Sequence, residues 1–198
     1  MNKLSLIAAT ILTATSFAAS ASHDKPTIEV GYISQTLEAK SFGVDADGDG
    51  FGVRGLMPLP MNTFLAAGYE WTTVEQAGID ADIEQARLGG GYGLAISGSL
   101  HLYGQLEYAR LKLDDDSVEG FAAHVGLRGE VTPSLEMYSR IGYVDLENDA
   151  DGYEAIAGAS YDFGKVSLFA EYKMLSIEDV DGDESELGNL SLGLRHSF

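Results

Sequence analysis

The feature that most constrains this chain is a strict two-residue alternation at its C-terminal end. Between Asn189 and Phe198 the sequence reads N-L-S-L-G-L-R-H-S-F, which places Leu190, Leu192 and Leu194 on one face of an extended chain. The intervening positions carry small or polar residues. Because successive side chains of a strand point to opposite faces, this pattern predicts a β-strand that lies between two unlike environments.

The same alternation recurs along the chain and predicts ten strands. We expect them at about 27–36, 50–58, 63–73, 82–93, 99–112, 119–131, 135–146, 153–163, 166–177 and 188–198. Each is about ten residues long, which matches a tilted strand that crosses a bilayer. Eight strands is the alternative, because the segment 50–58 is short, rich in glycine and ends at Pro58.

The connections between these segments alternate in length and charge. Those after the second, fourth, sixth and eighth strands are short and nearly uncharged, whereas the other five hold most of the chain's 31 acidic residues. A soluble barrel would show the same strand alternation. Up-and-down pairing of ten strands, however, places all acidic loops at one end and all tight turns at the other, which is typical of outer-membrane barrels. The predicted fold class is therefore all-β, a transmembrane up-and-down antiparallel β-barrel.

The N-terminal residues indicate export. Lys3 precedes an apolar stretch, and Ala19-Ser20-Ala21 forms a small-residue cleavage site, so residues 1–21 are predicted to be a signal peptide. Residues 22–198 are then one barrel domain, placed in the outer membrane of a Gram-negative cell. The chain has no cysteine, which excludes a disulfide framework. Its net charge of −19 excludes nucleic acid as a partner, because phosphate binding needs basic patches.

Two stretches resemble a known family. Residues 45–55 form an acidic segment that runs into a Gly-rich strand, and the turn at 132–136 is followed by Tyr138 and by Ile141-Gly142-Tyr143. The chain resembles the small exported outer-membrane β-barrel proteins that were once labelled quorum-sensing or immunity-activating factors. The resemblance implies the barrel fold and the outer-membrane location, and it carries no mechanism.

The expected partners follow from that resemblance and from the outward-facing residues. The last strand is similar to the closing strands that the barrel-assembly machinery reads, and the residues that would be read are Leu190, Leu192, Leu194 and Phe198. Outer-membrane lipid and lipopolysaccharide would surround the wall, and the barrel is expected to be a monomer. Arg110 and Lys112 point outward by alternation, just below the third acidic loop, where they could contact lipopolysaccharide phosphates.

Many charged residues are predicted to face the lumen. They are Glu29, Arg54, Glu70, Arg87, Glu107, Arg128, Glu130, Glu136, Arg140, Glu154, Glu171, Lys173 and Arg195. Buried charges must be paired or hydrated, since an isolated buried ion is costly. One interpretation is a salt-bridged plug that fills a narrow barrel. The other is a thin solute path, for which inward-facing glycines such as Gly126 and Gly142 would leave room.

The acidic loops contain a calcium-like spacing. Asp45, Asp47, Asp49 and Gly50 match the start of a D-x-D-x-D-G loop, but the twelfth position is Leu56 rather than glutamate, which argues against an EF-hand. We expect weak, shared binding of Ca²⁺ or Mg²⁺ across three loops, with no cofactor required. The candidate metal ligands are Asp45, Asp47, Asp49, Asp149, Asp151, Asp179, Asp181 and Asp183.

An enzyme is not expected. His124 could pair with Glu107 or Glu154, but no serine lies in a nucleophile elbow and the chain has no cysteine. The sequence therefore predicts a non-enzymatic outer-membrane barrel with a mostly occluded lumen. Its five acidic surface loops would bind divalent cations and help to organise the outer membrane. The alternative is a narrow, porin-like pore that prefers cations, as the acidic mouth suggests.

Overall fold

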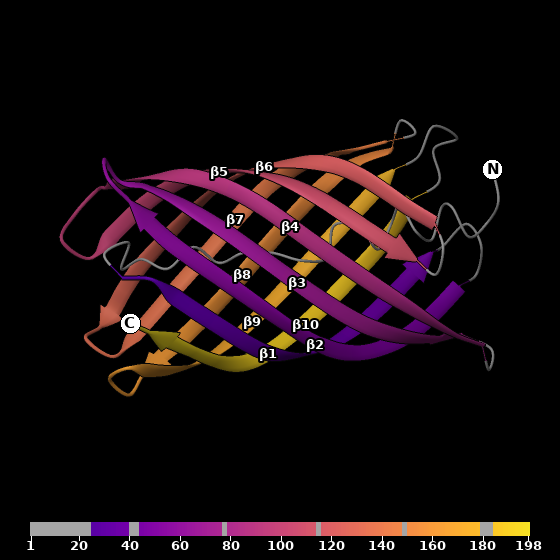
Figure 1. The fold of residues 1–198 in the computed structure, drawn as a ribbon, viewed down its shortest axis with the longest axis horizontal. Helices are drawn as coiled ribbons and strands as arrows, with labels where there is room; N and C mark the ends of the chain where they lie inside the picture. The colour runs from indigo at the N-terminus through magenta and orange to yellow at the C-terminus, as the bar shows by residue number, and fades with distance from the viewer. Residues whose placement is uncertain (1–24, 40–43, 77–78, 114–115, 148–149, 179–183) are drawn as a thin grey trace.

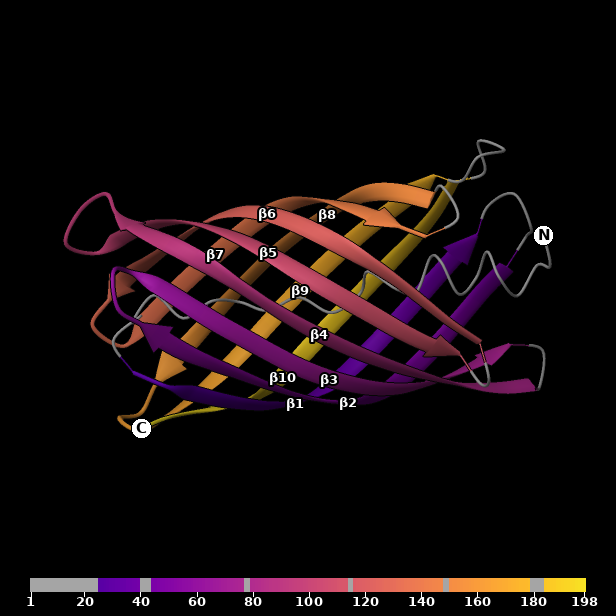
Figure 2. The ribbon, with the colours of Figure 1, turned by 45° about the horizontal axis from the view of Figure 1, so that its top comes forward.

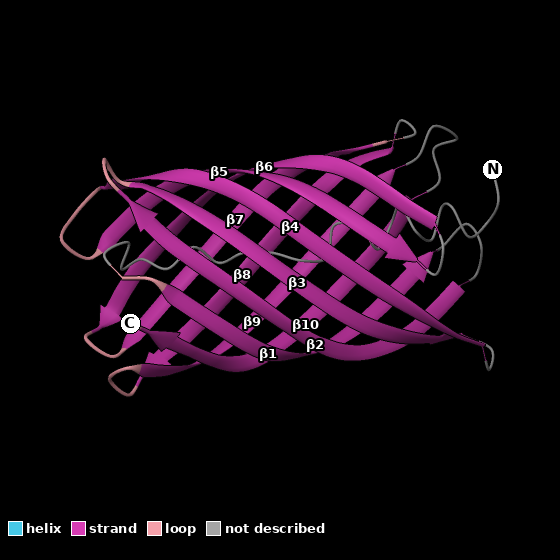
Figure 3. Cartoon of the chain, viewed as in Figure 1, coloured by secondary structure: helices cyan, strands magenta, loops and turns pink. Residues whose placement is uncertain are grey.

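A computed structural model describes residues 25–39, 44–76, 79–113, 116–147, 150–178 and 184–198 of the chain. They form ten strands: β1 (Thr27–Ala39), β2 (Val44–Leu59), β3 (Thr63–Gln76), β4 (Ile79–Ala95), β5 (Leu100–Leu113), β6 (Asp116–Thr132), β7 (Leu135–Leu146), β8 (Ala150–Asp162), β9 (Val166–Glu178) and β10 (Glu184–Ser197). The described part of the chain is drawn as strands and loops (Figure 3), and it contains no helix long and apolar enough to cross a membrane. The expected signal peptide lies outside these ranges.

The sheet closes into a barrel because β1 pairs with β10 as well as with β2. Val30 in β1 lies opposite Leu194 in β10 on one side and opposite Val53 in β2 on the other. The strands are strongly tilted, and β10 runs beside β1 in both views (Figures 1 and 2). The ten-stranded prediction is confirmed over eight strands, because β2 is a full part of the wall and Pro58 is only its next-to-last residue.

Several strands extend beyond their predicted bounds at the acidic end. β2 begins at Val44 rather than at residue 50, β4 at Ile79 rather than at 82, and β10 at Glu184 rather than at 188. Apolar alternation stops in these segments, but backbone pairing continues, and Asp47 lies opposite Glu75. Backbone hydrogen bonds of a ladder do not depend on side-chain polarity, so the acidic sequence did not reveal these extensions.

The wall exposes its apolar face and buries its polar face. In β10, Leu190, Leu192 and Leu194 are 47%, 49% and 56% exposed, whereas the inward-facing Ser191 and Arg195 are 6% and 3% exposed. A soluble barrel would bury the apolar face. The observed orientation is the one that a surrounding apolar solvent favours.

Aromatic rings cover several of the inward-facing glycines. Tyr103 lies opposite Gly126 on the next strand, and Tyr138 lies opposite Gly158. A Cβ atom would lie 2.5 Å from the Tyr103 ring at Gly126, and 2.3 Å from the Tyr138 ring at Gly158. The same arrangement joins Phe64 with Gly91 and Phe169 with Gly193. These glycines therefore provide space for rings, where the sequence analysis had considered space for a channel.

An apolar layer lies inside the barrel near the acidic end. Its buried members are Leu37, Ala46, Val74, Ile83, Ala122, Val144, Leu146, Leu175, Ile177 and Leu187. Most of them come from the last inward-facing positions before the acidic connections, and Leu175 is 0% exposed. The sequence pattern predicts a polar lumen, and this apolar layer departs from that prediction.

The two ends of the barrel differ as predicted. The turns that follow β2, β4, β6 and β8 lie at one end together with the C-terminus (Figure 1). Two of these turns contain positive φ values that are typical of tight turns: Met61 and Asn62 after β2 have 63° and 59°, and Gly164 after β8 has 110°. The other five connections join strands at the opposite end, where the acidic residues concentrate.

Candidate functional site

The buried and half-buried charged side chains that face the lumen come from all ten strands and balance in number. Among the described residues the bases are Arg54, Arg87, Arg128, Arg140, Lys173 and Arg195, and the acids are Glu29, Glu70, Glu107, Glu136, Glu154 and Glu171. Each of these was predicted to point inward. Glu130 was also predicted inward, and its partner across the β6–β7 pairing is the lumen-facing Glu136. It is exposed because it lies at the turn-end mouth of the lumen. The buried charges described in the lumen therefore account for none of the chain's excess negative charge.

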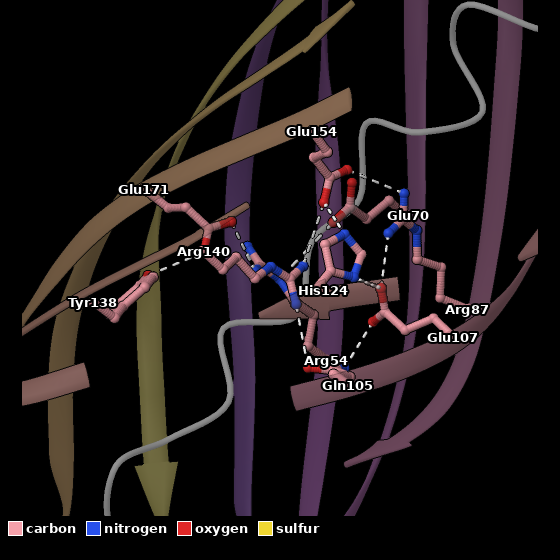
Figure 4. Close-up of polar contacts among 10 residues, drawn as sticks. All are labelled: Arg54, Glu70, Arg87, Gln105, Glu107, His124, Tyr138, Arg140, Glu154 and Glu171. Atoms are coloured by element: carbon pink, nitrogen blue, oxygen red, sulfur yellow. Dashed lines mark hydrogen bonds and ion pairs between the residues drawn. The ribbon is translucent and has the colours of Figure 1, made fainter. Parts of the chain in front are cut away.

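His124 lies at the centre of the first cluster of these charges (Figure 4). Its Nε2 atom is 2.9 Å from a Glu154 oxygen, and its Nδ1 atom is 3.4 Å from a Glu107 oxygen. Arg87 bridges the same two carboxylates, with contacts of 3.0 Å to Glu107 and 3.4 Å to Glu154. All four side chains are at most 1% exposed. The sequence predicted that His124 could pair with Glu107 or Glu154, and in the structure it contacts both.

Gln105 links this cluster to Arg140. Its amide nitrogen donates to Glu107 at 2.9 Å, and its amide oxygen accepts a hydrogen bond from Arg140 at 3.3 Å. Arg140 also lies 3.7 Å from Glu154. Gln105 is not among the predicted site residues, although its inward position beside Glu107 on the same strand face could have identified it.

A second cluster surrounds Arg54 on β2. Its guanidinium pairs with Glu171 at 3.0 Å and lies 3.9 Å from Glu29 and from Glu70. The other Glu171 oxygen accepts a hydrogen bond from the Tyr138 hydroxyl at 3.0 Å (Figure 4). Glu171 is therefore held from β2 and from β7 at once.

A third cluster lies in the lumen near the turn end. Arg195 contacts Glu29 at 2.6 Å and Glu136 at 3.0 Å, and Glu136 also pairs with Arg128. The Ser160 hydroxyl donates to the same Glu136 oxygen at 3.2 Å. Glu29 is shared with Arg54, so the second and third clusters are continuous.

The arrangement of the three clusters stabilises buried ions by mutual pairing. A carboxylate taken out of water is tolerated when cations and hydrogen-bond donors surround it. Both His124 nitrogens lie near carboxylates, and its side chain is 0% exposed. The geometry thus gives a lumen lined by paired charges, with six basic and six acidic side chains among the described residues.

The predicted metal ligands are only partly described. Asp47 and Asp49 lie on β2 with exposed side chains, and Asp151 lies on β8, where it accepts a hydrogen bond from the Tyr143 hydroxyl at 2.9 Å. Asp45 is part of β2, but its side chain is not described. The remaining candidates fall outside the described ranges: Asp149, Asp179, Asp181 and Asp183.

The calcium-like segment is a strand rather than a loop over the part that the structure describes. Asp47 and Asp49 stand side by side on the outer face of β2, so they do not converge as ligands of a calcium loop would. Within the described ranges, no group of three or more His, Asp or Glu residues is placed to hold a metal ion. The strand order does put the connections after β1, β7 and β9 next to one another around the rim.

Comparison with known proteins agrees with the fold. The chain matches the model of a family described as outer membrane protein beta-barrel domain over residues 4–163. No curated protein matches it by sequence. The β domain of the Bordetella autotransporter BrkA is similar in structure, with a TM-score of 0.60, 12% identity and coverage of 88% of this chain and 100% of that chain.

Two further solved structures give the same result. An outer membrane channel from Pseudomonas putida F1 has a TM-score of 0.59 at 11% identity, covering 88% of this chain and 95% of that chain. The translocator domain of the autotransporter NalP from Neisseria meningitidis has a TM-score of 0.52 at 14% identity, covering 94% and 91%. These likenesses concern the fold, and they give no support to the quorum-sensing label of the resembling family.

Proposed function

The chain belongs to the outer membrane protein beta-barrel domain family, and from that premise we propose that it is a non-enzymatic surface barrel with a closed lumen. In this proposal the barrel anchors five acidic loops at the cell surface. The loops bind divalent cations weakly and thereby help to organise the outer membrane. In this proposal the barrel catalyses no reaction and acts by displaying negative charge at the surface.

The observation that carries the closed lumen is its filling at successive levels. The apolar layer around Leu175 lies near the acidic end, the His124 cluster lies below it, and the Arg195 cluster lies near the turns. Counted over the whole residue, backbone included, Leu175, His124 and Arg195 are 0%, 5% and 3% exposed. A barrel of this strand number has an interior only slightly wider than its own side chains, so these levels support closure.

A narrow cation-preferring pore is the second candidate. It is favoured by buried donor atoms without a hydrogen-bond partner in the described network, namely Arg128 Nε and Nη1 and Arg195 Nη2. Buried donors of this kind are commonly satisfied by water. A chain of such waters near the turn end would form one end of an ion path through the lumen.

Planar-bilayer conductance of the refolded protein separates the two candidates. The closed barrel predicts no steady current, even though heat-modifiable gel migration shows folded protein. Replacing three layer residues together, as Leu37→Ala, Leu175→Ala and Leu187→Ala, should leave the lower clusters in place and still give no steps. Reproducible cation-selective steps from the unmodified protein would favour the pore and end the closed-lumen proposal.

Cation binding by the acidic end is tested by melting temperature with and without millimolar Ca²⁺ or Mg²⁺. We expect both ions to raise the melting temperature, because they neutralise like charges at one rim. The effect should be smaller in the triple variant Asp47→Asn, Asp49→Asn, Asp151→Asn. An equal response in the unmodified protein and the variant would show that these residues take no part. No response at all would remove cation binding from the proposal.

Assembly is proposed to depend on the outward face of β10. This face displays Leu190, Leu192, Leu194 and Phe198, each between 47% and 63% exposed. β10 also forms the closing seam with β1, where the first and last strands of the chain pair. Phe198→Ala should slow membrane insertion by the barrel-assembly machinery in reconstituted vesicles, while refolding in detergent stays unchanged. An equal slowing in detergent would point to barrel stability instead.

A further inference from the structure

Basic side chains are rare on the outer surface of the barrel. Among the described residues the exposed lysines and arginines are Lys25, Arg110, Lys112 and Lys165. Lys25 and Lys165 lie at the turn end, before β1 and between β8 and β9. Arg110 and Lys112 lie on one strand, β5, close to its acidic end. They are the two positive charges that the described wall presents at that end.

Each of these two bases faces an acid on a neighbouring strand. Lys112 Nζ is 3.4 Å from a Glu84 oxygen on β4, and Arg110 Nε is 3.7 Å from a Glu119 oxygen on β6. The other Glu84 oxygen accepts a hydrogen bond from the Tyr69 hydroxyl at 2.9 Å. We call Arg110, Lys112, Glu84 and Glu119 the β5 patch.

The position of the β5 patch along the wall matches the lipid headgroups. On the outer face of β5, Leu106 is 69% exposed and apolar, and the next outward position is the aromatic Tyr108. Arg110 and Lys112 follow Tyr108 towards the rim. Aromatic girdles mark the two interfaces of a membrane barrel, so charges just beyond one lie at headgroup depth.

The ion pairs within the patch are weak enough to exchange. The Arg110 and Lys112 side chains are 56% and 49% exposed, and exposed pairs at these distances contribute little to stability. A phosphate offers several acceptor oxygens and forms charge-assisted hydrogen bonds with guanidinium and ammonium groups. A phosphate therefore competes with the carboxylates for contact with both bases.

We propose that the β5 patch docks a phosphate group of lipopolysaccharide in the outer leaflet. The charge distribution favours phosphate binding at β5 over the rest of the wall. The outward charges described near the rim on the other strands are acidic, including Asp47, Asp49, Asp145 and Asp151. Those strands repel phosphate unless a cation intervenes. Docking on β5 requires only the outer-membrane location, so it stands whether or not the lumen conducts or the loops bind cations.

The test uses the protein refolded in detergent, with chelator present so that no divalent cation can bridge acid and phosphate. Native mass spectrometry measures retention of diphosphorylated lipid A and of the same lipid after phosphatase treatment. The unmodified protein should retain the phosphorylated form preferentially. In the double variant Arg110→Gln, Lys112→Gln we expect about tenfold weaker retention, in line with the loss of charge-assisted hydrogen bonds.

Two control variants test the direction of the effect on lipid retention. Glu84→Gln with Glu119→Gln removes the competing carboxylates and should strengthen retention of the phosphorylated lipid. Lys165→Gln removes an exposed base at the turn end and should leave retention unchanged. Equal retention by the unmodified protein and the Arg110/Lys112 double variant would overturn the proposal. So would equal retention of the two lipid forms, or binding that appears only when Mg²⁺ is added, which would assign the phosphate to the acidic strands.

Discussion

Two tyrosines on β7 make the same hydrogen bond in opposite environments. The Tyr138 hydroxyl donates to Glu171 at 3.0 Å inside the barrel, and the Tyr143 hydroxyl donates to Asp151 at 2.9 Å on its outer face. Glu171 also has the cation Arg54 at 3.0 Å. The comparison teaches that the lumen tolerates carboxylates only with cations nearby, whereas water at the rim allows an excess of acid.

The largest effect should come from removing one lumen carboxylate. Glu154→Ala takes one acidic partner from each of Arg87, His124 and Arg140, and leaves the six buried bases with five acids. It should destabilise the barrel by roughly 3–5 kcal/mol, because buried positive charge is left uncompensated. Urea unfolding after refolding into vesicles measures it. Asp151→Ala, three residues away on β8 but outward-facing, is the matched control and should show no resolvable change. A similar loss of unfolding free energy in both variants would show that carboxylates in the lumen and at the rim contribute equally to stability.

The next effect should come from filling the space beneath a lumen ring. Gly158→Ala places a Cβ atom 2.3 Å from the Tyr138 ring and should cost roughly 1–3 kcal/mol through overpacking. The same unfolding measurement applies. Gly55→Ala is the control, since the nearest atom to its Cβ would be 3.8 Å away. If Gly158→Ala left the unfolding free energy unchanged, the Tyr138 ring would be free to move into open space, contrary to a filled lumen.

A smaller effect should separate the two tyrosines directly. Tyr138→Phe keeps the ring over Gly158 but leaves Glu171 with one donor fewer, at a cost of about 1 kcal/mol. Tyr143→Phe should not change the unfolding midpoint measurably, because water replaces the lost hydroxyl. Equal midpoints for the two variants would show that Glu171 is as well hydrated as Asp151.

The smallest effect should be the salt dependence of the rim. Raising ionic strength screens repulsion between exposed acids and should raise the melting temperature slightly. Asp47→Asn with Asp49→Asn should reduce that salt response, whereas Glu154→Gln, which acts on a buried site, should leave it unchanged. A reduced response in the lumen variant would indicate that bulk ions reach the His124 cluster.

The sequence by itself favoured ten strands over eight, and it determined the wall orientation and the inward charges. Period-two alternation is local, and one residue of slip would move every side chain to the other face, so the pattern leaves little freedom. Leu190, Leu192 and Leu194 were placed outward, and Arg195 inward, without knowledge of any neighbour. The asymmetry of the two ends followed from the acidic connections in the same way.

Only the tertiary structure decided which side chains meet. Arg54 and Glu171 are 117 residues apart, and their contact depends on barrel closure and on how far each strand is staggered. Tyr138 faces Gly158 for the same reason. Glu130 is exposed although it pairs across β6 and β7 with the lumen-facing Glu136, because it lies at the mouth of the lumen. Local alternation assigns a face to each residue, but stagger and closure choose its partners, and those partners make the lumen a paired network.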